Sequence, residues 1–558
     1  IGLFLSVACI MAAQPLNTPD RLSGNKENFL LVTDRSHFIS GETMQFKAFR
    51  RGPSLEIPTD WSTILYIELI TSNGASLVQS KISLEPWGGY GSVTIPTSIS
   101  SGTYYLKAYT RWMRNCGPEA FSYTSIQVFD PFDGTVLPVD TTGQFTIPTG
   151  EENGGPEPAE VEFLDFSLDR SLYHARERVE IDLNWKHAIN SAHICVSVAK
   201  PEIQNNQVNF QSGCALTGKF RSIYIPEIQG VSLSGQSITS TGSLPVPYAT
   251  IYVSILGEDR NFFCNYSDSA GRFYFSFPAY TGERDLFVST YHPEHEDLKL
   301  LIDRDFSSDV LHLPSYPVSL NDSMLKIVTE LSVNAQVAQQ YYPPQLPATT
   351  EIVSDDRLFY GQPSATIRFD DFIKLPRLEE YFTEVIPQVS VRKSRGVRSF
   401  LVLGDHPDLT IYQPLVMIDG VAIFDVEAVL AVSPRLIDRV EIINAPYIRG
   451  NVTFGGIISI ISRNSDLGYI DLPSSGLLVN YQMLDYPMPD HGIMQPVDQR
   501  NPDVRNTLYW NPHLELTPGT NNQISFQTSD VKGFYQVLVR GYDSSGVYFE
   551  KSVPFTVE

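Results

Sequence analysis

The chain has 558 residues, which predicts three to five domains if a domain averages roughly 150 residues, and 42% of its residues are hydrophobic, as in ordinary globular cores. Acidic residues exceed basic ones by 63 to 40, and the resulting net charge of -23 argues against an unaided nucleic-acid binder or electrostatic docking on anionic lipids. The 37 Gly, 38 Pro, 28 Tyr and 31 Phe favour turns and half-buried strands, so the composition predicts a mainly β, multidomain chain.

The first thirteen residues form an apolar run that ends in Ala12 and Ala13 and is too short to span a bilayer. This pattern is typical of the core and cleavage site of a secretory signal, so we expect residues 1–13 to be a partial signal peptide of an exported protein. A buried first strand and lipid attachment at Cys9 remain alternatives. No later segment approaches roughly 18 apolar residues, so no transmembrane helix is predicted.

The other four cysteines are dispersed, at Cys116, Cys195, Cys214 and Cys264. They contain no Cys-x-x-Cys pair, which argues against a zinc ribbon or a thioredoxin-type site. An oxidising compartment would permit a bridge such as Cys195 to Cys214. The spacing gives no disulfide framework, however, and buried free thiols are the favoured prediction.

Residues 14–131 alternate apolar and polar residues between turns, as in 65–70 and 101–109, and predict one β-sandwich. Residues 38–48, 101–104 and 109–115 resemble a macroglobulin-like β-domain of exported Bacteroidota proteins. Residues 132–160 are rich in Thr, Gly, Pro and Glu and predict a linker. A second β-sandwich is predicted at 161–225, with strands at 179–185 and 193–198, and is similar to a further macroglobulin-like domain.

Residues 226–320 predict a third small sandwich. The turn from Asp268 to Gly271 leads into an aromatic strand, and this resembles the carboxypeptidase regulatory-like domain, which implies a non-catalytic module. Residues 321–356 predict a helix and a linker. Its apolar positions recur at three- and four-residue steps, at Leu325, Val328, Leu331 and Ala335, before Pro343-Pro344 ends it.

Residues 357–490 differ from the preceding segments. A short helix is predicted at 371–382, a buried strand at 414–418 before the Asp419-Gly420 turn, a helical turn and strand at 433–443, and a strand after Gly455-Gly456. This order resembles the plug domain of TonB-dependent outer-membrane receptors, with a signature at Asp419, Gly420, Glu441, Gly455 and Gly456.

Those receptors follow the plug with a barrel of about 22 strands, which needs several hundred residues. Only 88 residues follow position 470, and we expect them to form one more small sandwich, at 491–558, rather than a barrel. The resemblance therefore does not imply active transport.

Three groups of residues suggest chemistry without specifying it. His292 and His295 could bind a metal, but Pro293 disfavours the helical spacing of zinc proteases, and a solvated loop is favoured. Cys116-Gly117-Pro118-Glu119 resembles the thioester motif of macroglobulins, Cys-Gly-Glu-Gln, but Pro118 and Ala120 depart from it. The paired carboxylates, which a glycosidase would need, are better explained as solvated acidic faces; they are Asp355-Asp356, Asp370-Asp371 and Glu379-Glu380.

Four aromatic residues could line a glycan surface, although core packing is the favoured prediction; they are Tyr104, Tyr109, Trp112 and Trp510. We therefore predict tandem Ig-like or macroglobulin-like β-sandwiches with one small α+β plug-like domain. The predicted function is a non-enzymatic cell-envelope interaction protein, an accessory to outer-membrane transport or assembly. It would lie in the periplasm or at the cell surface, bind an envelope protein through the plug-like domain and need no cofactor or metal. A surface adhesin or glycan-binding module is the alternative, and a cryptic hydrolase ranks last.

Overall fold

The structure is a computed structural model of the chain. It describes residues 27–51, 61–132, 136–137, 158–159, 163–187, 190–204, 208–210, 224–257, 260–295, 297–316, 321–342, 359–394, 396–486 and 500–558. The predicted signal segment, with Cys9, and most of the predicted linker at 132–160 lie outside these residues. The described residues form many small sheets, and the mainly β fold class is confirmed. Among them, no helix is long and apolar enough to cross a membrane.

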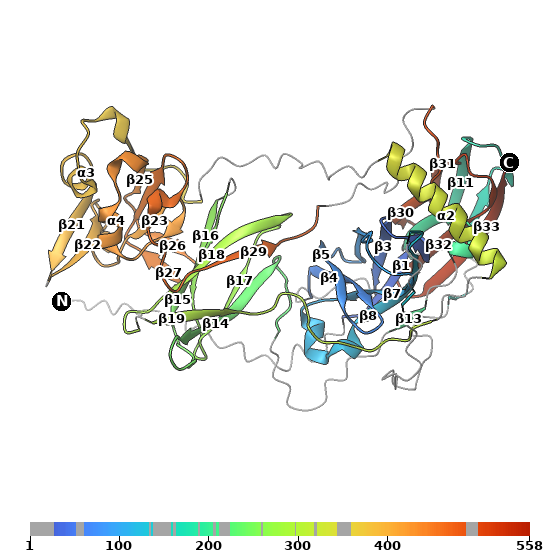
Figure 1. Ribbon diagram of the computed structural model, residues 1–558, viewed down its shortest axis with the longest axis horizontal. Coiled ribbons are helices and arrows are strands. Elements are labelled where there is room, and N and C mark those ends of the chain that lie inside the picture. Colours follow the sequence, from blue (N-terminus) through green and yellow to red (C-terminus); the bar gives the residue numbers. More distant parts are fainter. Residues whose placement is uncertain are drawn as a thin grey trace, which may run out of the picture. The chain divides into compact units, whose positions relative to one another are not determined.

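The chain divides into two compact units, and each collects segments that lie far apart in the sequence. Unit 1 consists of Ile1–Ile228, Phe306–Leu346 and Asp485–Glu558. Unit 2 consists of Gln229–Asp305 and Pro347–Leu484. The ribbon colours in Figure 1 show the same interleaving, because blue, teal and red strands from both ends of the chain lie together in unit 1.

The first sandwich belongs to unit 1 and contains the strands expected in the described part of residues 14–131. One sheet has the order β1-β3-β6, and the other has the order β13-β8-β7-β4-β5, with β2 paired to β8. The strands are β1 (Phe29–Thr33), β2 (His37–Ile39), β3 (Thr43–Arg50), β4 (Ile64–Thr71), β5 (Ser76–Ser83), β6 (Gly88–Thr94), β7 (Gly102–Tyr109), β8 (Ser122–Phe129) and β13 (Asn209–Phe210).

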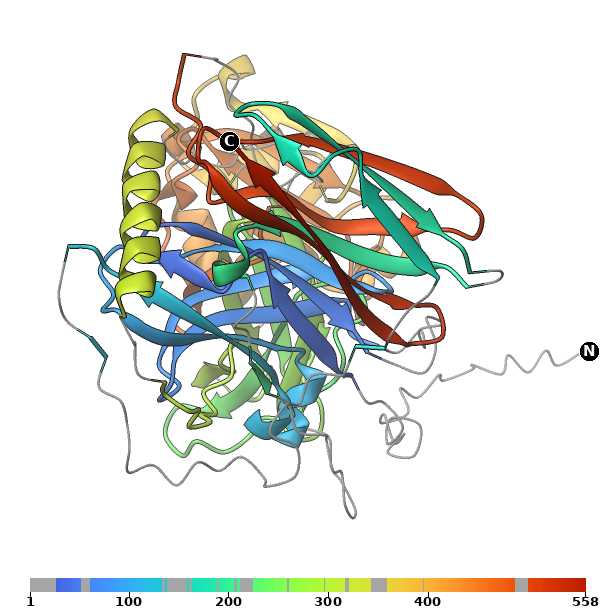
Figure 2. The same ribbon diagram turned by 90° about the vertical axis from the view of Figure 1, so that its right-hand side faces the viewer.

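The second sandwich also belongs to unit 1, and it is split in the sequence. One sheet has the order β10-β33-β32-β12-β30, and the other has the order β31-β11-β9. Figure 2 shows the red C-terminal strands interleaved with the teal ones. The strands are β9 (Leu164–Leu168), β10 (Leu172–Tyr173), β11 (Arg178–Trp185), β12 (Ala192–Ala199), β30 (Thr507–Leu516), β31 (Asn521–Gln527), β32 (Gly533–Asp543) and β33 (Tyr548–Val557).

This topology corrects the prediction of separate sandwiches at 161–225 and 491–558. All eight residues of β12 are buried, and β12 pairs with β30 on one edge and with β32 on the other. Without the C-terminal strands, β12 would present two unpaired edges, and the side chains of its inner face would lose the core that they share with Phe526, Val537 and Phe555. The two segments therefore form one domain.

The helix predicted after residue 321 is confirmed as α2 (Asp322–Tyr341). The side chain of Asn321 caps it by accepting a hydrogen bond from the Met324 N–H at 2.8 Å. Leu331 and Ala335 are buried against residues of the first and second sandwiches, whereas Leu325 is 51% exposed. The predicted apolar stripe is therefore covered along half of its length.

Residues 306–316, predicted as part of the third sandwich at 226–320, belong instead to unit 1 and cross the first sandwich. The Ser307 N–H donates to the Tyr109 hydroxyl at 2.7 Å, and the Leu313 N–H donates to the Ser72 carbonyl at 2.9 Å. These hydrogen bonds hold the segment on the sheet that contains β4 and β7.

The sandwich of unit 2 has sheets ordered β17-β14-β19 and β16-β15-β18-β29. The turn from Asp268 to Gly271 leads into β17, as predicted. The plug-like domain was predicted to extend from 357 to 490, but this C-terminal boundary is wrong. The last strand, β29, pairs with β18 and therefore belongs to the sandwich. The strands are β14 (Ser232–Thr239), β15 (Thr250–Ile255), β16 (Asn261–Tyr266), β17 (Arg272–Ser276), β18 (Glu283–Tyr291), β19 (Leu298–Ile302) and β29 (Leu477–Gln482).

Between β19 and β29 the chain forms an α/β body, here defined as residues 359–472. Its sheet has the order β20-β25-β28-β23-β24, and it carries the separate hairpins β21-β22 and β26-β27. The elements are β20 (Ala365–Arg368), α3 (Leu378–Glu384), β21 (Val389–Ser394), β22 (Val397–Val402), β23 (Leu415–Ile418), β24 (Val421–Ala422), α4 (Val426–Ala431), β25 (Ile437–Ile443), β26 (Tyr447–Arg449), β27 (Val452–Phe454) and β28 (Ile457–Ser462).

Candidate functional site

The candidate site is the α/β body, because the residues of the predicted plug-like signature lie on its sheet. Asp419 and Gly420 form the two-residue turn between β23 and β24, with φ values of +49° and +87°. Two positive φ values are what a tight hairpin of this kind requires, and Asp is among the non-glycine residues that tolerate them.

The Asp419 side chain is buried and holds together one end of the sheet. Its carboxylate accepts hydrogen bonds from the Ser462 N–H at 2.9 Å, the Ser462 hydroxyl at 2.6 Å and the Leu467 N–H at 2.9 Å. Arg260 lies 3.9 Å away. With these partners the carboxylate stabilises the chain where it leaves β28, and its role in the structure is a scaffolding one.

Glu441, in the middle of β25, is also buried and fully engaged. Arg439 donates to one of its carboxylate oxygens at 2.7 Å, and the Tyr360 hydroxyl donates to the other at 2.6 Å. Burial, together with the hydrogen bond to Glu441, raises the pKa of Tyr360, so the phenol keeps its proton and remains a donor.

Gly455 and Gly456 lie at the opposite end of the same strands. A Cβ on Gly455 would come within 2.1 Å of the Tyr412 carbonyl oxygen, and Gly456 has a φ of +91°. The backbone therefore requires glycine at both positions. The signature residues do not converge on one pocket; they occupy both ends and the middle of one sheet.

The α/β body packs on the four-stranded sheet of the unit 2 sandwich through an aromatic seam. Phe262 and Tyr252 of that sheet share a buried cluster with Met417 and Phe454 of the body. The ring of Phe424 lies 4.5 Å from Tyr252, measured between centroids. Arg449 also donates to the Phe262 carbonyl at 2.7 Å. These contacts fix the body on its sandwich within unit 2.

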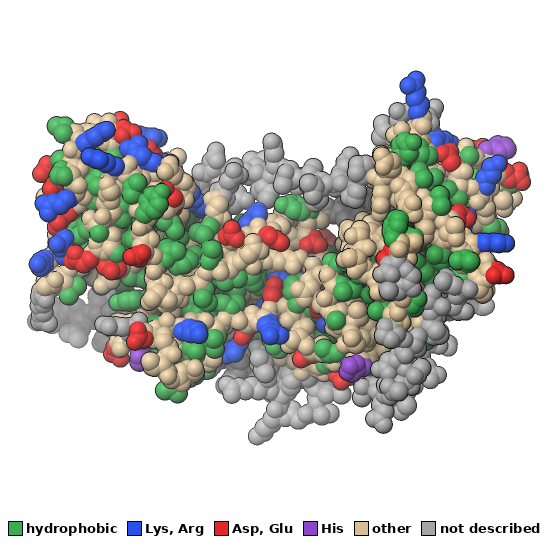
Figure 3. Space-filling view, in the orientation of Figure 1, with side chains coloured by type: hydrophobic (Ala, Val, Ile, Leu, Met, Phe, Trp, Pro, Cys, Tyr) green, Lys and Arg blue, Asp and Glu red, His purple; other side chains and the backbone are tan. Residues whose placement is uncertain are grey.

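The hairpin β21-β22 forms a separate two-stranded sheet of the body. It pairs with no further strand among the described residues, while α3 packs on β21 and α4 on β22. Arg392 and Lys393 are exposed and form no ion pair with another described residue, and Val397 is 71% exposed. Arg398 is bound to Glu379 at 3.1 Å. Figure 3 shows Lys and Arg side chains along the edge of the molecule where this hairpin lies.

The signal for the basic hairpin was available in the sequence, which has four basic residues between positions 392 and 398. The chain as a whole has a net charge of -23, whereas this short segment is positively charged. The exposure of Arg392 and Lys393 follows from the fold, which leaves these two positions of β21 uncovered.

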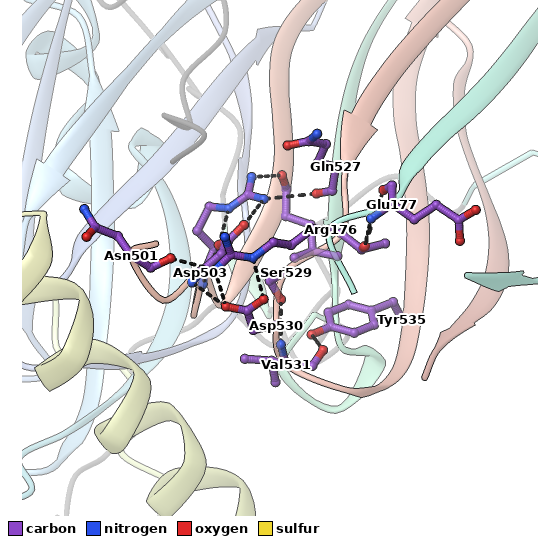
Figure 4. A network of polar contacts seen from close by, with 12 residues as sticks. Arg176, Glu177, Asn501, Asp503, Gln527, Ser529, Asp530, Val531 and Tyr535 are labelled. Carbon is purple, nitrogen blue, oxygen red and sulfur yellow. Dashed lines mark hydrogen bonds and ion pairs between the residues drawn. The ribbon is translucent and has the colours of Figure 1, made fainter. Parts of the chain in front are cut away.

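A network of polar contacts, shown in Figure 4, connects the two sequence segments that form the second sandwich. Arg176 donates to both carboxylate oxygens of Asp530, at 2.7 and 2.6 Å, and Arg505 donates to both of Asp503, at 2.8 and 2.7 Å. The Asp503 N–H donates to Asp530 at 2.8 Å, which joins the two pairs. This Arg–Asp clasp (Arg176, Asp503, Arg505 and Asp530) connects segments more than 300 residues apart.

Replacing Asp503 with alanine is expected to lower the free energy of unfolding of unit 1 by about 2–4 kcal/mol, because the buried carboxylate is the bidentate partner of Arg505. The matched control is D165A, whose carboxylate forms an exposed ion pair with Lys186 and should have no measurable effect. Urea unfolding of each variant measures the difference, and equal stabilities of D503A and D165A would contradict the clasp.

Among the described residues, three of the four paired carboxylates bind arginines. Arg463 donates to both oxygens of Asp370, at 2.9 and 2.7 Å. Arg398 and Arg377 bind Glu379 and Glu380 respectively. Asp355-Asp356 lies outside the described residues.

The two histidines of the predicted loop, His292 and His295, have ring centroids 4.8 Å apart. The described residues contain no group of three or more His, Cys, Asp or Glu side chains arranged to hold a metal ion.

The cysteines differ in part from the prediction. Cys195 and Cys264 are buried free thiols, as expected, which excludes the bridge from Cys195 to Cys214. Cys116, however, is disulfide-bonded, and its partner lies outside the described residues. The bond also occupies the sulfur that a thioester at Cys116 would need.

The aromatic residues considered for a glycan surface are core residues. Tyr104 and Trp112 are each 2% exposed, Trp510 is 1% exposed, and Tyr109 is fully buried. None of the four can therefore contact a glycan in the folded protein.

No family model matches the sequence, and no curated protein matches it either. Among solved structures, the chain is similar to an Escherichia coli alpha-2-macroglobulin activated by porcine elastase, at 8% identity and a TM-score of 0.24. A Salmonella alpha-2-macroglobulin reacted with methylamine matches at 10% identity with the same score. These matches cover 95% and 96% of this chain but 44% and 40% of those proteins, so the chain spans less than half of their length.

The Yersinia pseudotuberculosis adhesin InvE matches at 12% identity and a TM-score of 0.13, over 50% of this chain and 60% of that one. Scores this low do not establish a shared arrangement of domains.

Proposed function

We propose that this chain is an exported, non-enzymatic interaction protein of the bacterial envelope, an accessory to outer-membrane transport or assembly that binds a partner protein through its plug-like α/β body. In this proposal the sandwiches are the macroglobulin-like and carboxypeptidase regulatory-like modules that the sequence resembles. They hold the α/β body and leave its hairpin free to bind.

The basic hairpin β21-β22 is the observation that carries the proposal. Arg392 and the exposed Val397 lie on one face of the hairpin and Lys393 on the other, so the hairpin carries positive charge on both faces and exposed apolar area on one. Its base is held by α3 and α4. Interfaces use such charges to steer a complementary partner and a small apolar centre to retain it. The partner surface in this proposal is therefore an acidic one on an envelope protein.

Two further observations support the proposal. The disulfide at Cys116 is a bond that forms and persists in oxidising compartments outside the cytoplasm, which favours export. The aromatic seam holds the α/β body in one orientation on its sandwich within unit 2, and a fixed orientation lowers the entropy that a binding surface loses when a partner docks.

The test is affinity purification of the full chain from native envelopes in mild detergent, followed by mass spectrometry. The native protein should retain an envelope partner, and recovery should fall at least tenfold in the double variant R392E/K393E, because both exposed cations would repel an acidic surface. Recovery should also fall as the salt concentration rises. The matched control is K299E/K532E, which makes the same change in net charge at two exposed lysines elsewhere.

The control variant should retain the partner at the native level. Two results would contradict the proposal: native protein that is recovered without any envelope protein, or equal recovery of the partner by R392E/K393E and by K299E/K532E.

A further inference from the structure

Within unit 1, the outer face of the sheet β1-β3-β6 packs on the second sandwich. Leu30, Val32 and Phe49 of the first sandwich share a buried cluster with Cys195, Trp510, Tyr542 and Tyr548 of the second. At the edge of this contact, Arg540 donates to the Thr33 carbonyl at 2.7 Å, and Thr507 donates to Asp34 at 2.6 Å. The two sandwiches are therefore joined by a closed interface, here called the sandwich joint.

A lysine lies at the centre of the sandwich joint. The strand register places Lys47 between Val32 and Tyr90, in the middle of the sheet face that the second sandwich covers. Lys47 is fully buried, and its Nζ has no hydrogen-bond partner among the described residues. Its amine lies 5.5 Å from the ring centroid of Phe49 and 5.4 Å from that of Tyr90.

A charged amine in this position loses its hydration and gains little in return from the groups around it. Burial lowers the pKa of Lys47 to about 7, although Cys195 and Glu85 act in the opposite direction. Burial raises the pKa of Cys195, so this thiol remains neutral near pH 7 and does not supply a thiolate to pair with the ammonium ion. The faces of two aromatic rings are a weak substitute for water around a charged amine.

Titratable and charged groups from both sandwiches lie around Lys47. His193 of β12 has a lowered pKa, chiefly because it is buried, and the charge of Lys47 lowers this pKa further. The ring of Trp87, from the turn between β5 and β6, stacks on His193 at 4.5 Å and on His513 at 4.1 Å between centroids. Other charged groups around the joint are Asp34, Arg35, Arg51, Glu85, Glu515, Arg540 and Glu550.

We propose that the sandwich joint is a proton-sensitive device, closed while Lys47 is neutral and opening when Lys47 takes up a proton from solvent. The proton binds to the lone pair of Nζ, and the ammonium ion gains hydration when the two sheets separate. His193 adds to the effect at lower pH, since its imidazolium would lie beside the Lys47 ammonium ion.

The direction of the pH dependence follows from proton linkage. In the open state Lys47 meets water and has its ordinary pKa of 10.5, so the open state binds a proton at a higher pH than the closed state does. The closed state is fully favoured above pH 10.5, loses stability as the pH falls from 10.5 to 7, and loses no more to Lys47 below 7. One proton changes the opening equilibrium about tenfold per pH unit within this window.

The chain contains its own reporter for opening. Cys195 is a fully buried free thiol at the sandwich joint, whereas Cys264 is a buried free thiol in unit 2. The experiment labels the full-length native protein with 4,4′-dithiodipyridine between pH 7 and 9.5 and follows each cysteine by peptide mass spectrometry. The ratio of the Cys195 rate to the Cys264 rate removes the common pH dependence of thiol chemistry.

In the native protein the ratio is expected to rise about tenfold for each pH unit from 9.5 down to 8, and less steeply from 8 to 7 as the pH approaches the pKa of Lys47 in the closed state. In K47M, which keeps an unbranched apolar side chain at this position, the ratio should stay low and constant. In K47R, whose guanidinium keeps its charge throughout this range, it should be high at every pH. Far-UV circular dichroism checks that each protein remains folded.

A constant ratio in the native protein would overturn the proposal even if neither variant folded. A tenfold rise per pH unit in K47M, or a low ratio in folded K47R at pH 9.5, would overturn it as well.

Discussion

Replacing Asp419 with alanine should lower the free energy of unfolding of the α/β body by about 3–5 kcal/mol. Two backbone N–H groups and one hydroxyl donate to this carboxylate, and all of them would lose their acceptor. The two donors of Ser462 are buried, and the Leu467 N–H is partly buried. Each buried donor left without a partner costs about 1–3 kcal/mol. Chemical unfolding followed by the circular dichroism of the full chain measures the loss.

Two controls separate the role of Asp419 from a general effect of removing an aspartate. D419N keeps an acceptor oxygen and a residue that tolerates the positive φ, so it should cost less than D419A. D425A removes the exposed cap of α4, which accepts hydrogen bonds from Glu427 and Ala428, and should cost about 1 kcal/mol. If D419A cost no more than D425A, Asp419 would not be holding this end of the sheet.

The α/β body was predictable from the sequence because its signals are local. The apolar run at 415–418 before Asp419-Gly420 requires a buried strand and a tight turn, and the structure has β23 followed by that turn. The run after Gly456 is likewise β28. The sequence could not show that Asp419 would bind Ser462 and Leu467, because those contacts depend on the parallel pairing of β23 with β28.

The division of the second sandwich into two distant segments was not predictable, because it depends on pairing between strands far apart in the sequence. Alternation identifies β11 and β12 as strands and does the same for the strands after residue 507. Alternation does not identify the partner of an unpaired edge, and here the partners are separated by the whole of unit 2. Short segments of similar size therefore suggested two small sandwiches where there is one.

The burial of Lys47 was likewise not predictable, because it depends on contact with a second domain. A lysine that alternates with Phe46 and Ala48 on a strand is expected to face solvent. The strand does turn Lys47 outward from the first sandwich, but the second sandwich covers that face, so the residue is buried. Alternation along a strand separates its two faces but does not show whether a second domain covers the outer one.

Removing residues 500–558 is expected to unfold what remains of the second sandwich. The variant would lack β30, β31, β32 and β33, so β12 would lose both neighbouring strands and β11 would keep only β9. Trp185, which is 1% exposed in a core shared with Phe549, would be left open to water. Losing aromatic residues of this kind from a core costs about 3–5 kcal/mol each, and this truncation removes several at once.

Hydrogen exchange of the chain truncated after residue 499 tests most directly whether the C-terminal segment completes the second sandwich. The structure predicts that amides of β11 and β12 lose their protection, while those of β15 and β18 in unit 2 keep it because β29 is still present. Adding the 500–558 segment as a separate peptide should restore protection in β11 and β12. Full protection of β11 and β12 in the truncated chain would contradict the claim and would show that the two segments fold as separate domains.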